Sequence, residues 1–440
     1  MMPVTVLDRS AGRVDTMPAV ADPREAHAAP SLWTFALLLI QLAALAAVFR
    51  AFAIENRSFN LVVALCFGGF AVHYWLPVRF KEWFWVALSL AGSFVILDTG
   101  PASVLIASAL AIYVIATARL PFGARLAMLI GLGGVLAYGR ATLAFGLPNR
   151  FWQVLGAIFM FRLAVYLYDI RHSKAQPTLR EYLSYFLVLP NYHFLLFPVI
   201  DYQTMRKTYY QRDAHLIAQQ GISWMLRGTI QLLLYRVIYY LKPASSPEQV
   251  TTFWTLVSLM VLTYLLYLRV SGHFHIVIGL LHLFGYDLPE THRRYLLART
   301  LTDFWRRINI YWKDFMVKLV YFPVYFRMRK SGERRAQIMA TTLVFVVTWL
   351  LHSYQWFWLR GTWLFTWNDA LFWAILGGLV IVNMLMERRR KVTGPPHWRE
   401  RAVAALQTAG TFCLIVVLWS FWNEATVEEW LDLVTWREVG

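Results

Sequence analysis

The sequence predicts an all-α polytopic integral membrane protein with roughly 10–12 transmembrane helices. Of its 440 residues, 58% are hydrophobic and only 15% are charged, which is more apolar surface than a water-soluble domain can cover. The apolar runs continue nearly from end to end. We therefore expect one membrane-embedded unit without a separate water-soluble catalytic domain.

The chain divides into a tail, one long membrane domain and a second tail. Residues 1–30 mix Ala, Pro and charged residues without an apolar core, which predicts a disordered cytoplasmic tail and not a signal peptide. Residues 31–422 form a single transmembrane domain, and residues 423–440 form the C-terminal tail. Several of the apolar runs are short or interrupted by charge, so not every run is a full crossing. The runs cover residues 31–49, 59–77, 83–97, 101–118, 126–139, 151–168, 182–200, 223–241, 252–269, 273–285, 336–352, 370–386 and 402–422.

The net charge of +17 indicates membrane topology more than nucleic-acid binding. The basic residues form short clusters between apolar spans, as the positive-inside rule requires, and do not form one continuous binding face. They favour contact with anionic lipid head groups, and a second interpretation is docking of an acidic acyl carrier protein or of coenzyme A phosphates. The predicted cytoplasmic clusters are Arg79 and Lys81, Arg119 and Arg125, Arg171 and Lys174, Arg327 to Arg335, and Arg388 to Lys391.

Two stretches do not fit a simple series of crossings. Residues 201–222 and 286–335 are too polar to span a bilayer and too aromatic to be loose linkers, so we expect amphipathic or re-entrant helices there. Non-spanning backbone at membrane depth is tolerated only where protein buries it or where it lines a cavity. These stretches are therefore predicted to form cavity walls.

Cysteine, metal and nucleotide chemistry have little support in the sequence. Cys66 and Cys413 lie far apart in apolar runs, which favours neither a disulfide framework nor a thiolate metal site. His273, His275 and His282 lack a carboxylate at the HExxH spacing, so we expect no metal site and interpret His275 as a polar residue lining the cavity. Patterns of the GxGxxG, P-loop and GxSxG types are absent.

His352 is the first candidate catalytic residue. It lies at the far end of an apolar run that begins near Ala336 and spans about one bilayer thickness. A buried neutral imidazole can take a proton from a hydroxyl group that attacks an acyl carbon. The alternative is a histidine at a helix end that only hydrogen-bonds to the backbone.

Asn309 is the second candidate catalytic residue. Its amide could donate a hydrogen bond to an acyl carbonyl oxygen or orient the imidazole. The alternative is a helix cap or a polar contact between helices. Close to Asn309 in the sequence, the candidate substrate-binding residues are Trp305, Arg306 and Arg307. The two arginines either bind the phosphates of the donor or anchor an interfacial helix.

Five segments in order resemble the membrane-bound O-acyltransferase family, in particular its bacterial branch of alginate O-acetylation and teichoic-acid D-alanylation. SGHFHIVIGLLHLFGYDLPETHRRYL resembles the family stretch SGYSDMAIGLxxLLGFxxPxNFxxPY, FWRRINIYWKDF resembles FWRRWHISLSxWxRDY, and TWLLHSYQW resembles the GLWHG-type histidine site. LGAIFMFRLAVYLYDIRH and FLVLPNYHFLLFPVI resemble two upstream segments. His275 replaces an Asp of the family pattern, so the chain resembles a divergent member.

The resemblance implies acyl transfer from a thioester donor, acyl-CoA or an acyl carrier protein, to a hydroxyl group. The reaction would take place in a central tunnel with a catalytic core at about residues 151–386. It implies that His352 is the catalytic histidine and that Asn309 occupies the second polar position, where some branches have His and others Asn. No metal or organic cofactor is implied. The expected location is the bacterial inner membrane, with a periplasmic acyl-transfer protein as a further partner.

Two other classes of function remain open. A transporter or flippase would use the polar residues as a permeation path, but the sequence has few acidic residues at membrane depth and no convincing inverted repeat. A non-catalytic scaffold of an envelope biosynthesis complex would tolerate the loss of His352. An acceptor for the acyltransferase could be a polysaccharide, a lipid or a secreted small molecule.

Overall fold

Helices dominate the chain throughout the part that the structure describes. The computed structural model describes residues 30–142, 145–173, 176–194, 197–242, 250–386 and 398–435. These ranges contain no β-strand and only one isolated antiparallel bridge, between Tyr209 and Tyr286. The predicted cytoplasmic tail, residues 1–30, falls outside the described residues apart from Pro30, and so does the end of the C-terminal tail.

Eight helices in the described ranges are long and apolar enough to cross a membrane, which confirms the predicted all-α membrane fold. Each has at least 18 residues, which corresponds to about 27 Å at the α-helical rise and matches the hydrocarbon core of a bilayer. They are α2 (Leu32–Ala51), α4 (Val78–Leu97), α5 (Thr99–Thr117), α6 (Phe122–Thr142), the joined α12 (Phe253–Leu265) and α13 (Leu268–His282), α17 (Glu333–Arg360), α18 (Trp367–Met386) and α19 (Trp398–Asn423).

The other helices are shorter, broken or more polar. With 28 residues, α11 is long enough to cross a bilayer, but it is not among the eight helices that are also apolar enough. The helices α7, η1 and α8 follow one another without a gap. These other elements are α3 (Arg57–His73), α7 (Asn149–Ala157), η1 (Ile158–Arg162), α8 (Leu163–His172), α9 (Leu179–Phe186), η2 (Leu189–Tyr192), α10 (Tyr202–Lys207), α11 (Ala214–Leu241), η4 (Tyr295–Leu297), α14 (Leu301–Arg307), α15 (Ile310–Met316), η5 (Val317–Tyr321), α16 (Phe322–Met328), η6 (Arg329–Ser331) and α20 (Val427–Val434).

The two spans predicted at residues 252–269 and 273–285 are wrong as separate spans. The chain is helical from Phe253 to His282, with only a bend at residues 266–267. Two polar side chains close to the gap between the predicted spans share one partner on a neighbouring segment. Arg269 and His273 both contact the Glu55 carboxylate, at 3.3 and 2.9 Å.

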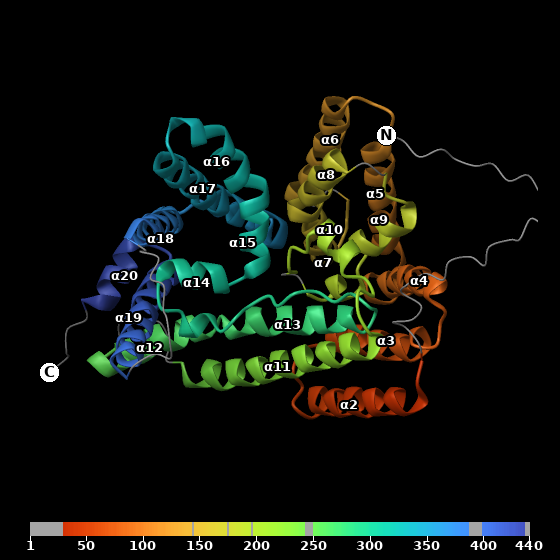
Figure 1. Ribbon diagram of the computed structural model, residues 1–440, viewed down its shortest axis with the longest axis horizontal. Coiled ribbons are helices and arrows are strands. Elements are labelled where there is room, and N and C mark those ends of the chain that lie inside the picture. The colour runs from red at the N-terminus through yellow and green to blue at the C-terminus, as the bar shows by residue number, and fades with distance from the viewer. Residues whose placement is uncertain are drawn as a thin grey trace, which may run out of the picture.

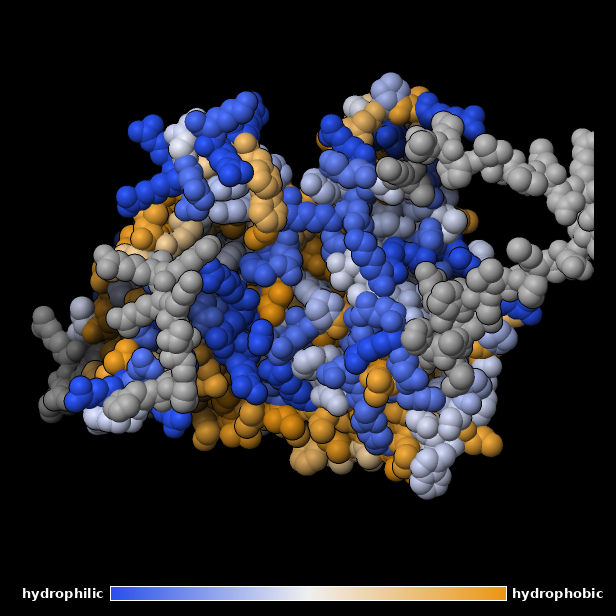
Figure 2. Space-filling view, viewed as in Figure 1, coloured by the Kyte–Doolittle hydropathy of each residue, from blue (hydrophilic) through white to orange (hydrophobic). Residues whose placement is uncertain are grey.

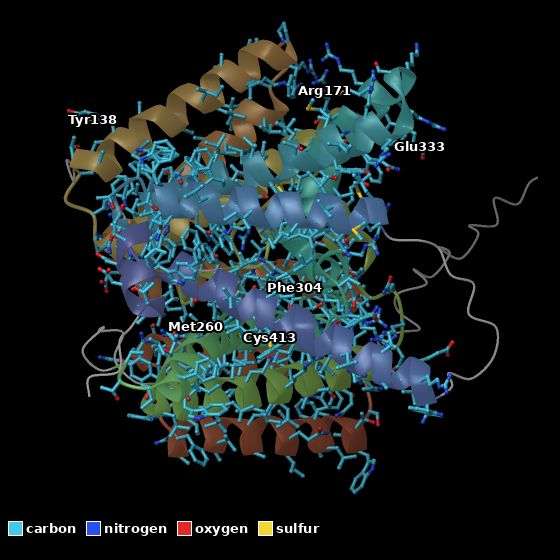
Figure 3. All side chains as sticks on the ribbon, turned by 90° about the vertical axis from the view of Figure 1, so that its left-hand side faces the viewer. Tyr138, Arg171, Met260, Phe304, Glu333 and Cys413 are labelled. Carbon is cyan, nitrogen blue, oxygen red and sulfur yellow. The ribbon has the colours of Figure 1, made fainter. Side chains whose placement is uncertain are left out.

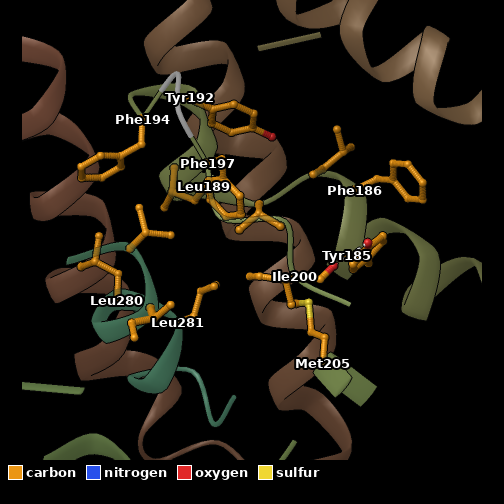
Figure 4. Packing of buried hydrophobic residues seen from close by; sticks show 14 of the residues in the cluster. Tyr185, Phe186, Leu189, Tyr192, Phe194, Phe197, Ile200, Met205, Leu280 and Leu281 are labelled. Carbon is orange, nitrogen blue, oxygen red and sulfur yellow. Dashed lines mark hydrogen bonds between the residues drawn. The ribbon is translucent and has the colours of Figure 1, made fainter. Parts of the chain in front are cut away.

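The span predicted at residues 182–200 is also wrong as one helix. Its described residues comprise the end of α9, the 3₁₀ helix η2 and, at residues 197–200, a segment without regular structure, because Pro190 and Pro198 lack the amide hydrogen that a continuous helix needs. Protein surrounds this irregular backbone: Leu189, Tyr192 and Phe197 pack in the core (Figure 4). The Tyr185 hydroxyl donates a hydrogen bond of 2.8 Å to the Ile200 carbonyl.

The helices form two lobes over a shared layer. In Figure 1, α2, α3, α11 and α13 lie alongside one another, and above them α5, α6, α8 and α9 form one lobe while α15, α16 and α17 belong to the other. Figure 2 shows hydrophilic residues over the centre of the face turned to the viewer and hydrophobic residues along its lower edge. This distribution is typical of a helical bundle with an apolar belt in the bilayer.

Basic residues mark one end of the bundle. Arg171 and Glu333 lie toward one end of the long helices and Tyr138 lies toward the other (Figure 3). The exposed cluster in the α16–α17 turn lies at the first of these ends, which we call the basic end; it contains Arg327, Arg329, Lys330, Arg334 and Arg335. The positive-inside rule predicts that the basic end faces the cytoplasm.

Glycines bring α11 and α13 into backbone contact. A Cβ atom added to Gly228 would lie 2.6 Å from the Gly272 carbonyl oxygen, and one added to Gly279 would lie 2.5 Å from the Gly221 carbonyl oxygen. Both distances are shorter than a real Cβ contact. Small residues at such positions are typical of tightly packed transmembrane helices.

We expect Gly279→Ala to destabilise the protein by about 1–3 kcal/mol, because the new methyl group pushes α11 and α13 apart. The measurement is the thermal unfolding midpoint of the purified protein in detergent. Gly131→Ala in α6 is the matched control, since nothing lies within 4 Å of the position of its Cβ atom. Equal midpoints for the two variants would contradict the packing argument.

Candidate active site

Asn309 lies in a chain of short helices, as predicted for this non-spanning stretch. It separates α14 from α15 and has a left-handed backbone, with φ of 41° and ψ of 64°. Asn tolerates this conformation better than most residues. Its side-chain Oδ1 accepts a hydrogen bond of 3.3 Å from the Trp312 amide, so Asn309 caps α15.

His352 lies on α17 among aromatic rings. Its Nδ1 is 2.8 Å from the Thr348 carbonyl oxygen. A carbonyl oxygen only accepts hydrogen bonds, so Nδ1 carries the hydrogen and Nε2 of the neutral ring carries the lone pair. The imidazole packs against the indoles of Trp312 and Trp373, with ring centroids 5.2 and 4.7 Å apart.

Both candidate residues line one cavity of about 370 Å³. His352 and Asn309 are the two candidate catalytic residues predicted from the sequence. The fold brings them to the same cavity, His352 from α17 and Asn309 from the α14–α15 junction. Six tryptophans contribute to its walls: Trp305, Trp312, Trp356, Trp373, Trp419 and Trp422. The polar lining comes from Asn309, His352, Tyr267, Lys313 and Gln355.

Trp422 is held by a buried carboxylate. Its indole nitrogen donates a hydrogen bond of 2.7 Å to Asp369, which is 4% exposed in the first turn of α18. The indole stacks on Phe372 at 4.5 Å and lies 6.3 Å from the His352 ring. Sequence reasoning missed Tyr267, Trp373 and Trp422, because no local pattern shows which distant aromatic residues meet His352.

Only one of the four predicted substrate-binding residues lies at the cavity. Trp305 lines the cavity, but Arg306, Arg307 and His275 do not. The Arg307 guanidinium forms an ion pair of 2.6 Å with Asp303, and Arg306 is exposed. His275 is buried on α13, where its Nδ1 lies 2.7 Å from the Gln231 side-chain oxygen.

The three histidines of the α13 region have different partners. His273 contacts Glu55, His275 contacts Gln231, and His282 lies 2.6 Å from the Ile278 carbonyl oxygen. Among the described residues, no group of three or more His, Cys, Asp or Glu side chains is arranged to hold a metal ion.

A second cavity of about 690 Å³ lies beside the first. Val199 lines both cavities, and Lys207, Lys318, Asp201 and Asp314 contribute charges to the second. Aromatic rings stand between the two: Phe161 of the first cavity packs against Phe315 of the second, with ring centroids 5.8 Å apart.

An ion-pair network anchors the wall that the cavities share. The Lys318 ammonium, on the π-helix η5, contacts the carboxylates of Asp169 and Asp201. Asp169 is 1% exposed. The network ties η5 to α8 and to the start of α10, and so holds the segment that carries Trp312 and Phe315 in place.

Comparison with known proteins assigns no family. No family model matches the chain, and no curated protein matches it.

We expect Lys318→Met to destabilise the protein by about 3 kcal/mol, because it leaves the buried Asp169 carboxylate without its cation. Thermal unfolding in detergent measures the effect. Lys207→Met is the control, since Lys207 is exposed and lines the same cavity. If both variants unfold at the wild-type temperature, the ion pairs do not anchor this wall.

Proposed function

We propose that the protein is a membrane-bound acyltransferase that moves an acyl group from a thioester donor to a hydroxyl group, with His352 as general base. One observation carries the proposal. The hydrogen bond from Nδ1 to the Thr348 carbonyl leaves the lone pair of the neutral ring on Nε2, and His352 lines an aromatic cavity together with Asn309. This is the protonation state that a general base needs before the reaction.

The proposed reaction has two steps. Nε2 of His352 takes the proton of the acceptor hydroxyl while the hydroxyl oxygen attacks the thioester carbonyl carbon. Negative charge then develops on the carbonyl oxygen, and the Asn309 Nδ2 donates a hydrogen bond to it. The C–S bond breaks as the tetrahedral intermediate collapses, and the leaving sulfur takes the proton from the imidazolium. The products are an ester and a free thiol.

The donor and the acceptor follow from the same proposal. An acyl-CoA or acyl carrier protein thioester would enter from the basic end, where the second cavity lies beside the first. The thioester itself supplies the activated acyl group, so the proposal requires no metal or organic cofactor. A polysaccharide, a lipid or a secreted small molecule would supply the hydroxyl group. The resemblance to the O-acyltransferase family supports this assignment, and it favours the bacterial inner membrane and a periplasmic transfer partner.

A transporter, a flippase or a scaffold is the competing class of function. The residues around the cavity weigh against a path for ions, because rings of six tryptophans form much of its wall and Asn309, His352 and Lys313 are among its few strongly polar groups. A scaffold would not need the lone pair of His352. The acyltransferase therefore differs from the competing class of function in its dependence on the His352 imidazole.

We expect His352→Ala to lower the rate of acyl transfer by about 10²-fold or more, as the loss of a general base does. The assay offers labelled acyl-CoA and acyl carrier protein donors to purified protein, with lipid and glycan extracts as acceptors. His172→Ala is a matched control, because His172 makes the same type of contact, 2.7 Å from the Tyr168 carbonyl, but lies exposed at the end of α8. Equal transfer by His352→Ala and wild type would exclude His352 as the base.

The variant Asn309→Asp distinguishes the helix-capping role of Asn309 from its proposed catalytic role. Aspartate keeps the oxygen that caps α15 and tolerates the left-handed backbone, but it lacks the N–H donor. The variant should unfold near the wild-type temperature, while kcat falls by about 10²–10³-fold. Wild-type kcat in Asn309→Asp would show that Asn309 is only a helix cap.

A further inference from the structure

Tyr267 is a further residue with a hydroxyl group whose side chain lines the cavity. It lies at the bend between α12 and α13, and it lines the cavity that contains His352 and Asn309. Its ring packs against Trp419 at 5.3 Å, and Trp419 packs against Trp422 at 5.2 Å. Through these indoles the wall continues from Tyr267 to the ring that contacts His352.

A buried histidine lies directly behind Tyr267. The Tyr267 hydroxyl is 3.0 Å from Nε2 of His292, whose side chain is fully buried. Four rings enclose the imidazole at centroid distances of 5.5 to 5.9 Å, those of Tyr267, Phe274, His275 and Tyr295. Burial, together with the nearby His275 and Arg227, lowers the pKa of His292 well below its ordinary value, so the ring is neutral.

The other nitrogen of this ring also has a partner. Nδ1 of His292 lies 3.1 Å from the Thr291 hydroxyl oxygen. In one of the two possible tautomers, the Thr291 hydroxyl donates to Nδ1, and Nε2–H donates to the Tyr267 oxygen. In this tautomer His292 does not accept the phenolic hydrogen of Tyr267, which remains available to another acceptor.

The segment that holds His292 also holds Asn309. The Ile310 amide donates a hydrogen bond of 2.8 Å to the Thr291 carbonyl, and the Arg293 amide donates one of 3.0 Å to the Arg307 carbonyl. Residues 291–293 and 307–310 therefore run side by side. The backbone pairing fixes Asn309 on one side and, through His292, Tyr267 on the other.

We propose that Tyr267 is a further catalytic residue, which donates a hydrogen bond to the oxygen that becomes negative during acyl transfer, and that His292 is its positioning residue. This inference rests on the proposed function. A phenol held by a buried neutral imidazole is a preorganised donor in a site with little water, where such donors stabilise a developing charge most strongly. The hydrogen bond involves no net proton transfer, so His352 remains the only base in the reaction.

The test compares Tyr267→Phe with Tyr295→Phe in the full chain. Both tyrosines pack on His292, but only Tyr267 lines the cavity. Release of free thiol from acetyl-CoA and from palmitoyl-CoA is followed in detergent, with lipid and glycan extracts as acceptors. We expect Tyr267→Phe to lower kcat by about 10²-fold with little change in KM, and we expect Tyr295→Phe to keep the wild-type kcat.

A second variant keeps the test independent of the folding of Tyr267→Phe. His292→Leu leaves the Tyr267 hydroxyl in the chain but removes the group that orients it, and we expect kcat to fall about tenfold at unchanged KM. A wild-type kcat in Tyr267→Phe, or a change in KM alone, overturns the catalytic role of Tyr267, and a wild-type kcat in His292→Leu overturns the positioning role of His292.

The inference and the proposed function can fail separately. If His352→Ala abolishes transfer while Tyr267→Phe leaves kcat unchanged, only the role of Tyr267 is overturned. If wild-type protein releases no thiol from the two CoA donors, nor from the matching acyl carrier protein thioesters, with any acceptor, the proposed function is overturned and the inference falls with it.

Discussion

A bilayer offers no hydrogen bonds to a polypeptide, and the arrangement of this chain follows from that constraint. The long helices satisfy their own backbone. Irregular segments are placed inside the protein, where side chains bind their free carbonyl groups: Arg162 donates to the Phe186 carbonyl at 3.0 Å, and Tyr311 donates to the Pro289 carbonyl at 2.8 Å. The cavity with His352 lies among these irregular segments, since only there can polar groups be directed inward at acceptable cost.

The polar groups of the cavity also serve the fold. Asn309 caps α15 with its side-chain oxygen and also lines the cavity, and the proposed catalytic role uses the other atom of the amide, the nitrogen. His352 likewise uses one nitrogen for the backbone and keeps the other for chemistry. In both cases a structural hydrogen bond fixes the orientation of a side chain to which we assign a catalytic role, and such preorganisation would limit the entropy lost when a substrate binds.

The basic residues around the cavities do not form the donor-binding site that the sequence predicts. Arg307 is paired with Asp303, and Lys318 is paired with two carboxylates, so these cations stabilise the walls of the cavities. Lys313 lines the first cavity, but it also forms an ion pair of 2.5 Å with Asp314. Recognition of a donor by its phosphates would therefore fall mainly to exposed basic residues outside the first cavity, and the aromatic interior would take the acyl group and the acceptor.

The sequence by itself determined the membrane class and the helical fold, and it supplied the prediction of a non-spanning stretch at residues 286–335 and the choice of His352 and Asn309 as candidates. These features depend on composition and on local patterns, because hydrophobicity and charge along a short window decide whether a segment can enter a bilayer. Only the tertiary structure decided that both residues line one cavity, that His275 and Arg307 point elsewhere, and that Tyr267 and His292 form a pair. Tyr267 is 25 residues from His292 and 85 residues from His352 by number, and contacts over such separations arise from helix packing, which no local pattern encodes.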